Sequence, residues 1–185
     1  MTRFEALVSL NLVREIGGLR LKKLLEFFDA PQDILKAPAE KLVRVCGIKE
    51  KIAHKIRALT KEDLERELSS AENLGLSIVT FEDKNYPENL RHIPDPAILL
   101  YVRGEIKAED ACAIGVVGSR KATFYGLTQA ERFSRELAEK GMTVVSGMAR
   151  GVDTAAHRGA LKAGGRTLAV MGSGFNRIYP QENES

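Results

Sequence analysis

The stretch ACAIGVVGSRKATFYGLTQAERFSRELAEKGMTVVSGMARGVDTAAHRGALKAGGRTLAVMG, residues 111–172, decides the fold because short apolar runs alternate in it with longer amphipathic ones. The runs ACAIGVV, MTVV and RTLAVMG have the length and apolar character of buried strands. The segments between them repeat apolar side chains at helical spacing. Strands that alternate with helices of this length predict right-handed crossovers and a parallel sheet. The predicted fold class is therefore α/β.

Two details fix how the predicted helices of this stretch are oriented. The helix that ends at Gly141 is expected to bury one face, made of Leu127, Ala130, Phe133, Leu137 and Ala138. The next helix is expected to begin at Asp153, because an N-cap carboxylate accepts a backbone N–H of the first helical turn.

Three turns follow the three predicted strands, and all have the same kind of composition. They are GSR at 118–120, SGMARG at 146–151 and GSGFN at 172–176, with Arg177 directly after the third. Ligands of parallel sheets bind beyond the carboxyl ends of the strands. Small residues let an anion approach backbone N–H groups, and arginine adds charge-assisted hydrogen bonds. Tight turn geometry explains any single turn equally well, but three in succession favour a phosphate-binding site.

Two enzymatic interpretations fit these turns less well. A nicotinamide dinucleotide site needs GxGxxG after the first strand, where this chain has GSRKAT, and an acidic residue after the second, where it has Ser146. Ser146, Asp153 and His157 suggest a hydrolase, but no GxSxG elbow is present, and a spacing of four residues on one helix equally suits a structural pair. We therefore expect no catalytic residues.

The first 60 residues predict short helices around two similar turns. Gly18-Leu19 and Gly47-Ile48 each separate helical apolar patterns, and a lysine follows each glycine by four residues, at Lys22 and Lys51. The pattern resembles paired helix-hairpin-helix units, in which such a turn presents N–H groups to a DNA phosphate. The second glycine of that motif is replaced by Arg20 and Lys49. A secondary DNA contact at the two lysines and a purely structural or partner-binding module both stay open.

The middle of the chain connects the helical region to the sheet. EDLERELSSAENLG predicts a charged amphipathic helix that stops at Gly75, and LSIVTF and AILLYV predict strands. We accordingly expect a helical domain over residues 1–62, a connection over 63–110 and a sheet domain over 111–185.

Composition and charge exclude several other classes of protein. Residues 1–60 carry 12 Lys and Arg against 7 Asp and Glu, residues 61–110 carry 6 against 12, and residues 111–185 carry 10 against 6. Basic ends around an acidic middle are weak support for a polyanionic partner. Cys46 and Cys112 lack metal-ligand or disulfide spacing, and no apolar run suggests a signal peptide or a membrane span. We therefore expect no metal, no cofactor, no membrane partner and a cytoplasmic location.

Longer motifs carry a resemblance to a known family. GVVGSRKATFYG at 115–126 and GMTVVSGMARGVDTAAHRGALKAGGRTLAVMGSGFNRIYPQEN at 141–183, with SIVTFEDKNYPENLRHIPDPAILLYVRG upstream at 77–104, resemble the DNA-processing protein A family, also called DprA or Smf. SGMARGVDTAAH and the final YPQEN are the most specific of these motifs. The resemblance implies a Rossmann-like parallel sheet, preceded by a small all-helical domain of the SAM-like or helix-hairpin-helix type.

The same resemblance implies a function without catalysis. A member of this family binds and protects single-stranded DNA without sequence specificity, and it helps to load the RecA recombinase during natural transformation and homologous recombination. The alternative from the residues alone is a nucleotide- or nucleoside-phosphate-processing enzyme on a related fold. A homodimer is implied for full-length members. The family's sheet continues past the YPQEN motif, so we expect this chain to be an N-terminal portion that lacks part of the DNA groove and of the recombinase surface.

The candidate site residues follow from the turns and from the resemblance together. The candidates for DNA or phosphate binding are Gly118, Ser119, Arg120, Ser146, Gly147, Arg150, Gly151, Phe175 and Arg177. Phe175 is expected to stack on a base or to pack as a core or lid residue, and Asp153 and His157 are expected to hold the loop.

Overall fold

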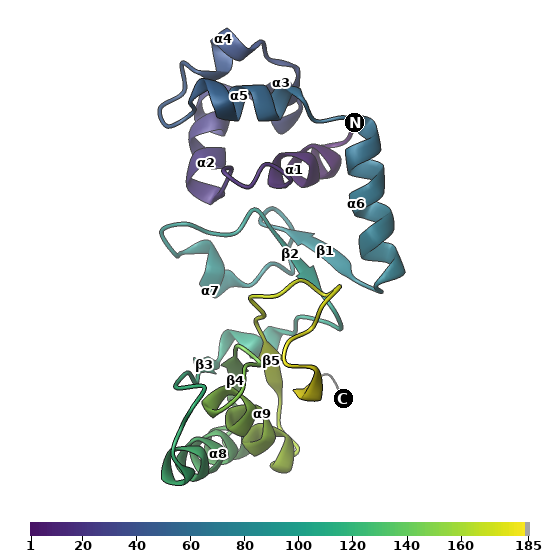
Figure 1. The fold of residues 1–185 in the computed structure, drawn as a ribbon. Coiled ribbons are helices and arrows are strands. Elements are labelled where there is room, and N and C mark those ends of the chain that lie inside the picture. The colour runs from purple at the N-terminus through teal and green to yellow at the C-terminus, as the bar shows by residue number, and fades with distance from the viewer. Residues whose placement is uncertain (184–185) are drawn as a thin grey trace. The chain divides into compact units, whose positions relative to one another are not determined.

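The computed structural model describes residues 1–183, and the chain divides into two compact units, residues 1–106 and residues 107 onward (Figure 1). The predicted α/β class, with a parallel sheet and a helical N-terminal region, is confirmed. Division of the chain at residues 62 and 110 stays a prediction. None of the helices described here is both long and apolar enough to cross a membrane.

The first unit is a set of short helices around one apolar core. Its helices are α1 (Arg3–Asn11), α2 (Gly18–Phe27), α3 (Pro31–Lys36), α4 (Ala39–Leu42), α5 (Glu50–Arg57), α6 (Lys61–Asn73) and α7 (Glu88–Arg91). Thr2 and Thr60 cap α1 and α6 through capping boxes, as sequences of the form Thr-x-x-Glu or Thr-x-x-Asp allow. Fully buried leucines and isoleucines fill the space between α1, α2, α3 and α5, among them Leu7, Leu10, Leu24, Ile34 and Ile56.

Two antiparallel strands complete the first unit. β1 (Ser77–Thr80) pairs with β2 (Leu99–Val102) in the register Ser77 to Val102. Leu99 packs with Val8 of α1 and Leu64 of α6, so the hairpin shares an apolar cluster with the helices.

Other residues of the first unit contact both glycine turns of the helical region. The backbone N–H of Leu19, at the start of α2, donates to the Asp95 carboxylate at 2.8 Å. A side chain at Gly18 would meet the Pro96 carbonyl oxygen, 2.0 Å from an ideal Cβ. The Arg20 guanidinium donates to the carbonyl oxygens of Gly47, at 3.2 Å, and Glu15, at 2.7 Å. The first turn therefore already holds a carboxylate where a phosphate would bind.

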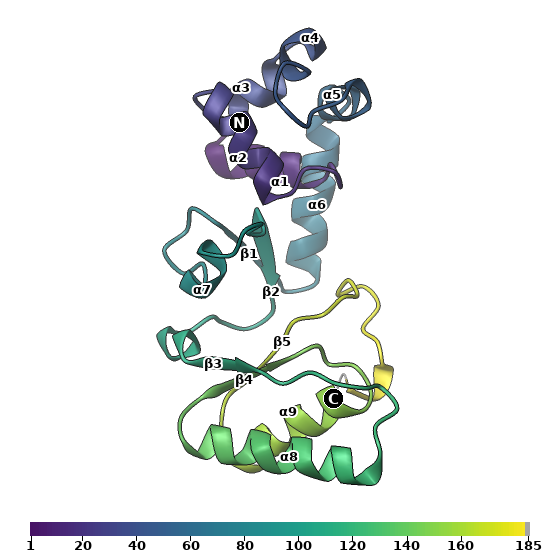
Figure 2. The ribbon, with the colours of Figure 1, turned by 90° about the vertical axis from the view of Figure 1, so that its left-hand side faces the viewer.

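The second unit is a three-stranded parallel sheet with two helices. The order is β3 (Ala113–Gly115), β4 (Thr143–Ser146) and β5 (Thr167–Ala169), with α8 (Phe124–Glu139) and α9 (Val152–Lys162) as the crossovers. The short 3-10 helices η1 (Ala108–Ala111) and η2 (Gln181–Asn183) flank them. Figure 2 shows α8 and α9 on the same face of the sheet, where Val144 is fully buried against them.

The buried face of α8 differs from the predicted one. Phe133, expected in the core, is 51% exposed, whereas Ser134 is fully buried. The reason is a close approach of α8 to α9, because an ideal Cβ on Gly159 of α9 would lie 2.2 Å from the Glu131 carbonyl oxygen. Only a stripe of small side chains fits at that distance, and Ala130, Ser134 and Ala138 supply it.

A charged cluster holds the amino ends of the strands. The Arg166 guanidinium donates to both oxygens of Asp110, at 2.5 and 2.7 Å, and the Thr143 hydroxyl donates to the same carboxylate at 3.0 Å. The Lys107 backbone N–H donates to it at 2.8 Å. Hydrogen bonding to Arg166, foremost, holds the pKa of Asp110 below its usual value, although burial opposes that shift.

Acid is expected to weaken the second unit through Asp110. Because its pKa is lower in the folded chain than the value of about 3.9 typical of unfolded chains, its contribution is complete above that value and is lost as the pH falls through the folded pKa. The loss of stability is measured by urea titrations at about pH 7 and about pH 3, in which hydrogen exchange of the β4 peptide reports unfolding of the second unit. Asp110→Asn should be less stable than wild type near pH 7 and should lose less on acidification. Equal acid losses in the two proteins would contradict this assignment.

Candidate phosphate-binding site at the strand ends

The first two turns pack against each other through their backbones. The Val152 N–H, at the start of α9, donates to the Ser119 carbonyl oxygen at 3.2 Å. Gly151 has φ +83°, and an ideal Cβ there would lie 2.3 Å from the Ser119 oxygen and 2.8 Å from the Arg120 oxygen. An ideal Cβ on Gly118 would lie 2.7 Å from a methyl carbon of Val152. These contacts place the Arg120 turn directly against the turn that carries Arg150.

The second turn is fixed by buried polar groups. The Ser146 hydroxyl donates to the Val116 carbonyl oxygen at 2.7 Å, so this buried side chain ties the ends of β3 and β4 together. The Asp153 carboxylate accepts from the Ala149 N–H at 3.2 Å, and an ideal Cβ on Gly147 would lie 2.7 Å from it. The predicted N-cap role of Asp153 is wrong, because Gly151 is the N-cap and Asp153 lies inside the first turn of α9.

His157 bonds to the sheet and not to Asp153. Its Nδ1 lies 2.7 Å from the Thr167 hydroxyl oxygen, and that hydroxyl donates to the Val144 carbonyl oxygen at 2.8 Å. Burial lowers the pKa of His157, while the charge of Asp153 opposes this shift. A neutral imidazole that bridges α9 and β5 fixes the direction of the helix behind the second turn.

Arg150 has an internal partner that sequence reasoning did not predict. Its guanidinium donates to both carboxylate oxygens of Glu182, at 2.7 and 3.1 Å, and lies 5.6 Å from the centre of the Tyr179 ring. The Asn183 amide donates to the Met148 carbonyl oxygen at 2.9 Å and to the Thr154 hydroxyl at 2.7 Å. The YPQEN motif therefore folds back on the second turn. The pairing lowers the pKa of Glu182 and raises that of Arg150, so both are charged at neutral pH.

The side chains of the first turn are available to a ligand. Arg120 and Lys121 are both exposed, and within residues 1–183 neither side chain makes a hydrogen bond or an ion pair. Lys121 follows the predicted site residues directly and adds a second cation. The Ser119 hydroxyl accepts from the Lys121 N–H at 3.1 Å, which closes the turn.

The third turn is more open than the other two. Ideal Cβ atoms on Gly172 and Gly174 would meet no atom within 4 Å, and the Arg177 N–H closes the turn on the Gly174 carbonyl oxygen at 3.1 Å. Phe175 is half-buried and Arg177 is exposed. The structure thus brings the first two turns together by direct contact, and the third turn follows the neighbouring strand β5.

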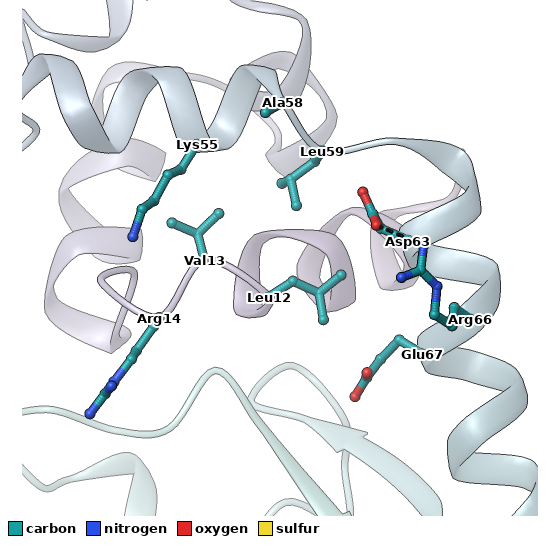
Figure 3. Close-up of a pocket in the computed structure, with 9 residues that line it drawn as sticks. All are labelled: Leu12, Val13, Arg14, Lys55, Ala58, Leu59, Asp63, Arg66 and Glu67. Carbon is teal, nitrogen blue, oxygen red and sulfur yellow. Dashed lines mark hydrogen bonds and ion pairs between the residues drawn. The ribbon is translucent and has the colours of Figure 1, made fainter.

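The secondary candidates Lys22 and Lys51 are exposed residues of the first unit. The first unit also contains a hollow whose lining includes Leu12, Val13 and Leu59 (Figure 3). Three of its charged side chains form ion pairs within the unit: Asp63 pairs with Arg66 at 3.2 Å, and Lys55 pairs with Glu15. This hollow lies within the first unit, and we assign no ligand to it.

Glycine-lined turns at the carboxyl ends of parallel strands, with exposed cations beside them, are the arrangement with which α/β proteins commonly hold anions. The model of the DNA recombination-mediator protein A family matches residues 77–185, more than half of the chain. The chain therefore belongs to the DNA recombination-mediator protein A family.

Individual relatives agree with this assignment. The chain is 32% identical over 177 residues to protein Smf of Synechocystis and 36% identical over 121 residues to the DNA processing protein DprA of Bacillus subtilis. These matches cover 92% and 65% of this chain but only 44% and 41% of the relatives. The chain thus spans less than half the length of those curated relatives.

Two solved structures resemble the structure of this chain. The crystal structure of DprA from Streptococcus pneumoniae aligns with all of this chain at a TM-score of 0.77 and 26% identity, over 62% of its own length. A DprA structure from Helicobacter pylori, described by its single-stranded DNA binding mode, aligns with 60% of this chain at a TM-score of 0.50 and 31% identity, over 49% of its own length.

The contact between the first two turns gives a test of the site's framework. Gly151→Ala is expected to loosen it, since the new methyl group must displace the Ser119 carbonyl oxygen, at a cost of about 1–3 kcal/mol beyond the backbone strain. Gly164→Ala is the matched control, because Gly164 also has positive φ, +65°, but has open space around it. Hydrogen exchange of peptides from β3 and α9 measures both. Similar protection in the two variants would refute the close contact.

Proposed function

We propose that the chain binds single-stranded DNA without sequence specificity, by holding successive phosphates on the turns after β3 and β4. The observation that carries this proposal is the backbone contact between Gly151 and the Ser119-Arg120 turn. That contact sets the exposed Arg120 and Lys121 beside the Arg150 turn, which suits an extended chain of phosphates better than one compact anion. Membership of the recombination-mediator family and the likeness to the DNA-binding Helicobacter pylori protein support the proposal.

The wider role follows from the family and not from the geometry. We propose that a bound strand is protected and passed to the RecA recombinase during natural transformation and homologous recombination, in the cytoplasm. RecA contact and a homodimer belong to this proposal. Binding is favoured over nucleotide processing because Asp153 and His157, an acid and an imidazole of α9 behind the second turn, are engaged with Ala149 and Thr167.

Removing one phosphate contact should change the salt dependence of binding. For single strands the slope of log affinity against log salt is about −0.7 per phosphate neutralised, so Arg120→Ala should make the slope shallower by about that amount. It should weaken oligo-dT and mixed sequences alike. Titration of labelled oligonucleotides across a salt series measures both effects.

Arg135→Ala serves as the control for Arg120→Ala, because Arg135 is an exposed arginine of the same unit that lies near Glu139 at the far end of α8. Its slope should equal that of wild type. Affinity that does not respond to salt, or an Arg120→Ala slope unchanged from wild type, would refute phosphate binding at this turn.

Glu182 should compete with DNA for Arg150. Glu182→Gln removes the charge and leaves the Arg150 fork free for a phosphate, so affinity should rise by about two- to fivefold, the scale of an exposed ion pair. In the Arg150→Ala background the same change should have no effect, and comparison of the four proteins isolates the coupling. Tighter binding in both backgrounds would show that Glu182 acts only through the general negative charge it adds.

A further inference from the structure

Two aromatic side chains at the start of α8 are exposed without a partner. Phe124 is 86% exposed and Tyr125 is 73% exposed. In the described part of the chain, neither ring has a hydrogen bond or a ring contact. Single exposed apolar residues are common, but here two consecutive residues of one helix each leave a large ring in water.

The position of these rings ties them to the proposed DNA site. They are the first two residues of α8, directly after the turn that carries Arg120 and Lys121. Figure 2 shows the chain leaving β3 and descending to the start of this helix. The Thr123 hydroxyl accepts from the Gly126 N–H at 3.1 Å and so caps α8. This cap fixes the start of the helix and therefore the positions of Phe124 and Tyr125. The rings and the cations therefore share one end of the sheet.

The charge around the rings indicates what covers them. No acidic residue occurs between Asp110 and Glu131, a segment that includes both cations and both rings. A partner protein surface would have to be both apolar and acidic to match this segment. An unpaired nucleic acid strand matches it without further conditions, because each nucleotide offers a phosphate for a cation and a flat base for a ring.

We propose that Phe124 and Tyr125 are the base-stacking platform of the site, and that they hold unpaired bases of the strand whose phosphates lie on Arg120 and Lys121. This inference rests on the proposed function and extends it from the sugar-phosphate chain to the bases. Stacking on a ring tolerates any base, so the platform adds affinity without adding sequence preference. It also selects single strands, because the bases of a duplex are already stacked on one another.

The test compares strands with and without bases. Phe124→Ala, Tyr125→Ala and the double variant are titrated against labelled oligo-dT and against an abasic strand of the same length. On oligo-dT the double variant should bind about 5- to 100-fold more weakly, with an unchanged salt slope. On the abasic strand it should bind like wild type. Phe133→Ala is the matched control, because Phe133 is a half-exposed ring of the same helix about two and a half turns away.

A substituted ring gives a second measurement. The chain contains no tryptophan, so Phe124→Trp introduces a single reporter whose fluorescence oligo-dT should quench and the abasic strand should not. Its affinity for oligo-dT should match or exceed that of wild type, because the larger ring can still stack.

Two results would overturn the platform while leaving the phosphate site intact. These are oligo-dT affinity equal to wild type in the double variant, and an equal loss on oligo-dT and on the abasic strand. If Arg120→Ala still makes the salt slope shallower in either case, only the inference about the rings fails. If Arg120→Ala leaves the slope unchanged as well, the proposed function fails with it.

Discussion

The site depends on a backbone contact that only glycine allows. Gly151 starts α9 with positive φ and lies against the carbonyl oxygens of Ser119 and Arg120, where no Cβ fits. A side chain there would push the first turn away from α9, and the hydrogen bond from the Val152 N–H to Ser119 would be lost with it. The spacing between two arginines is thus set by a residue that has no side chain.

The sequence predicts the elements of the sheet unit well because each has a strong local signal. Apolar runs of strand length, helices of the right period and glycines at helix ends are all found where they are expected. The face of α8 is predicted wrongly, since hydrophobicity alone places Phe133 inside. The structure buries Ser134 instead, because α9 approaches at Gly159 too closely for a ring. The preference for small residues arises from the packing of α8 against α9, so it cannot be predicted from the sequence of either helix alone.

The candidate site is predictable in composition but not in its internal contacts. The glycines and arginines of the turns are visible as motifs, and the structure joins two of the three turns. The Ser146 hydroxyl ties the end of β3 to β4. This contact depends on the pairing of the two strands, which the motif does not show. The bond from Glu182 to Arg150 spans 32 residues and depends on the return of the chain after the third turn. The sequence shows that YPQEN contains an acidic residue, but this residue indicates a pair with Arg150 only when the path of the chain back to the second turn is known.

These contacts make the cations of the site unequal. Arg120 and Lys121 are solvated, so a phosphate that binds them replaces only water and counterions. Arg150 already holds a carboxylate in a two-pronged geometry, so a phosphate there gains only the difference between two similar ion pairs. The proposed site would bind weakly at each contact and would have to use several contacts at once. That property suits a protein proposed to hold any sequence and then to release the strand to a recombinase, because exchangeable contacts can be replaced one at a time.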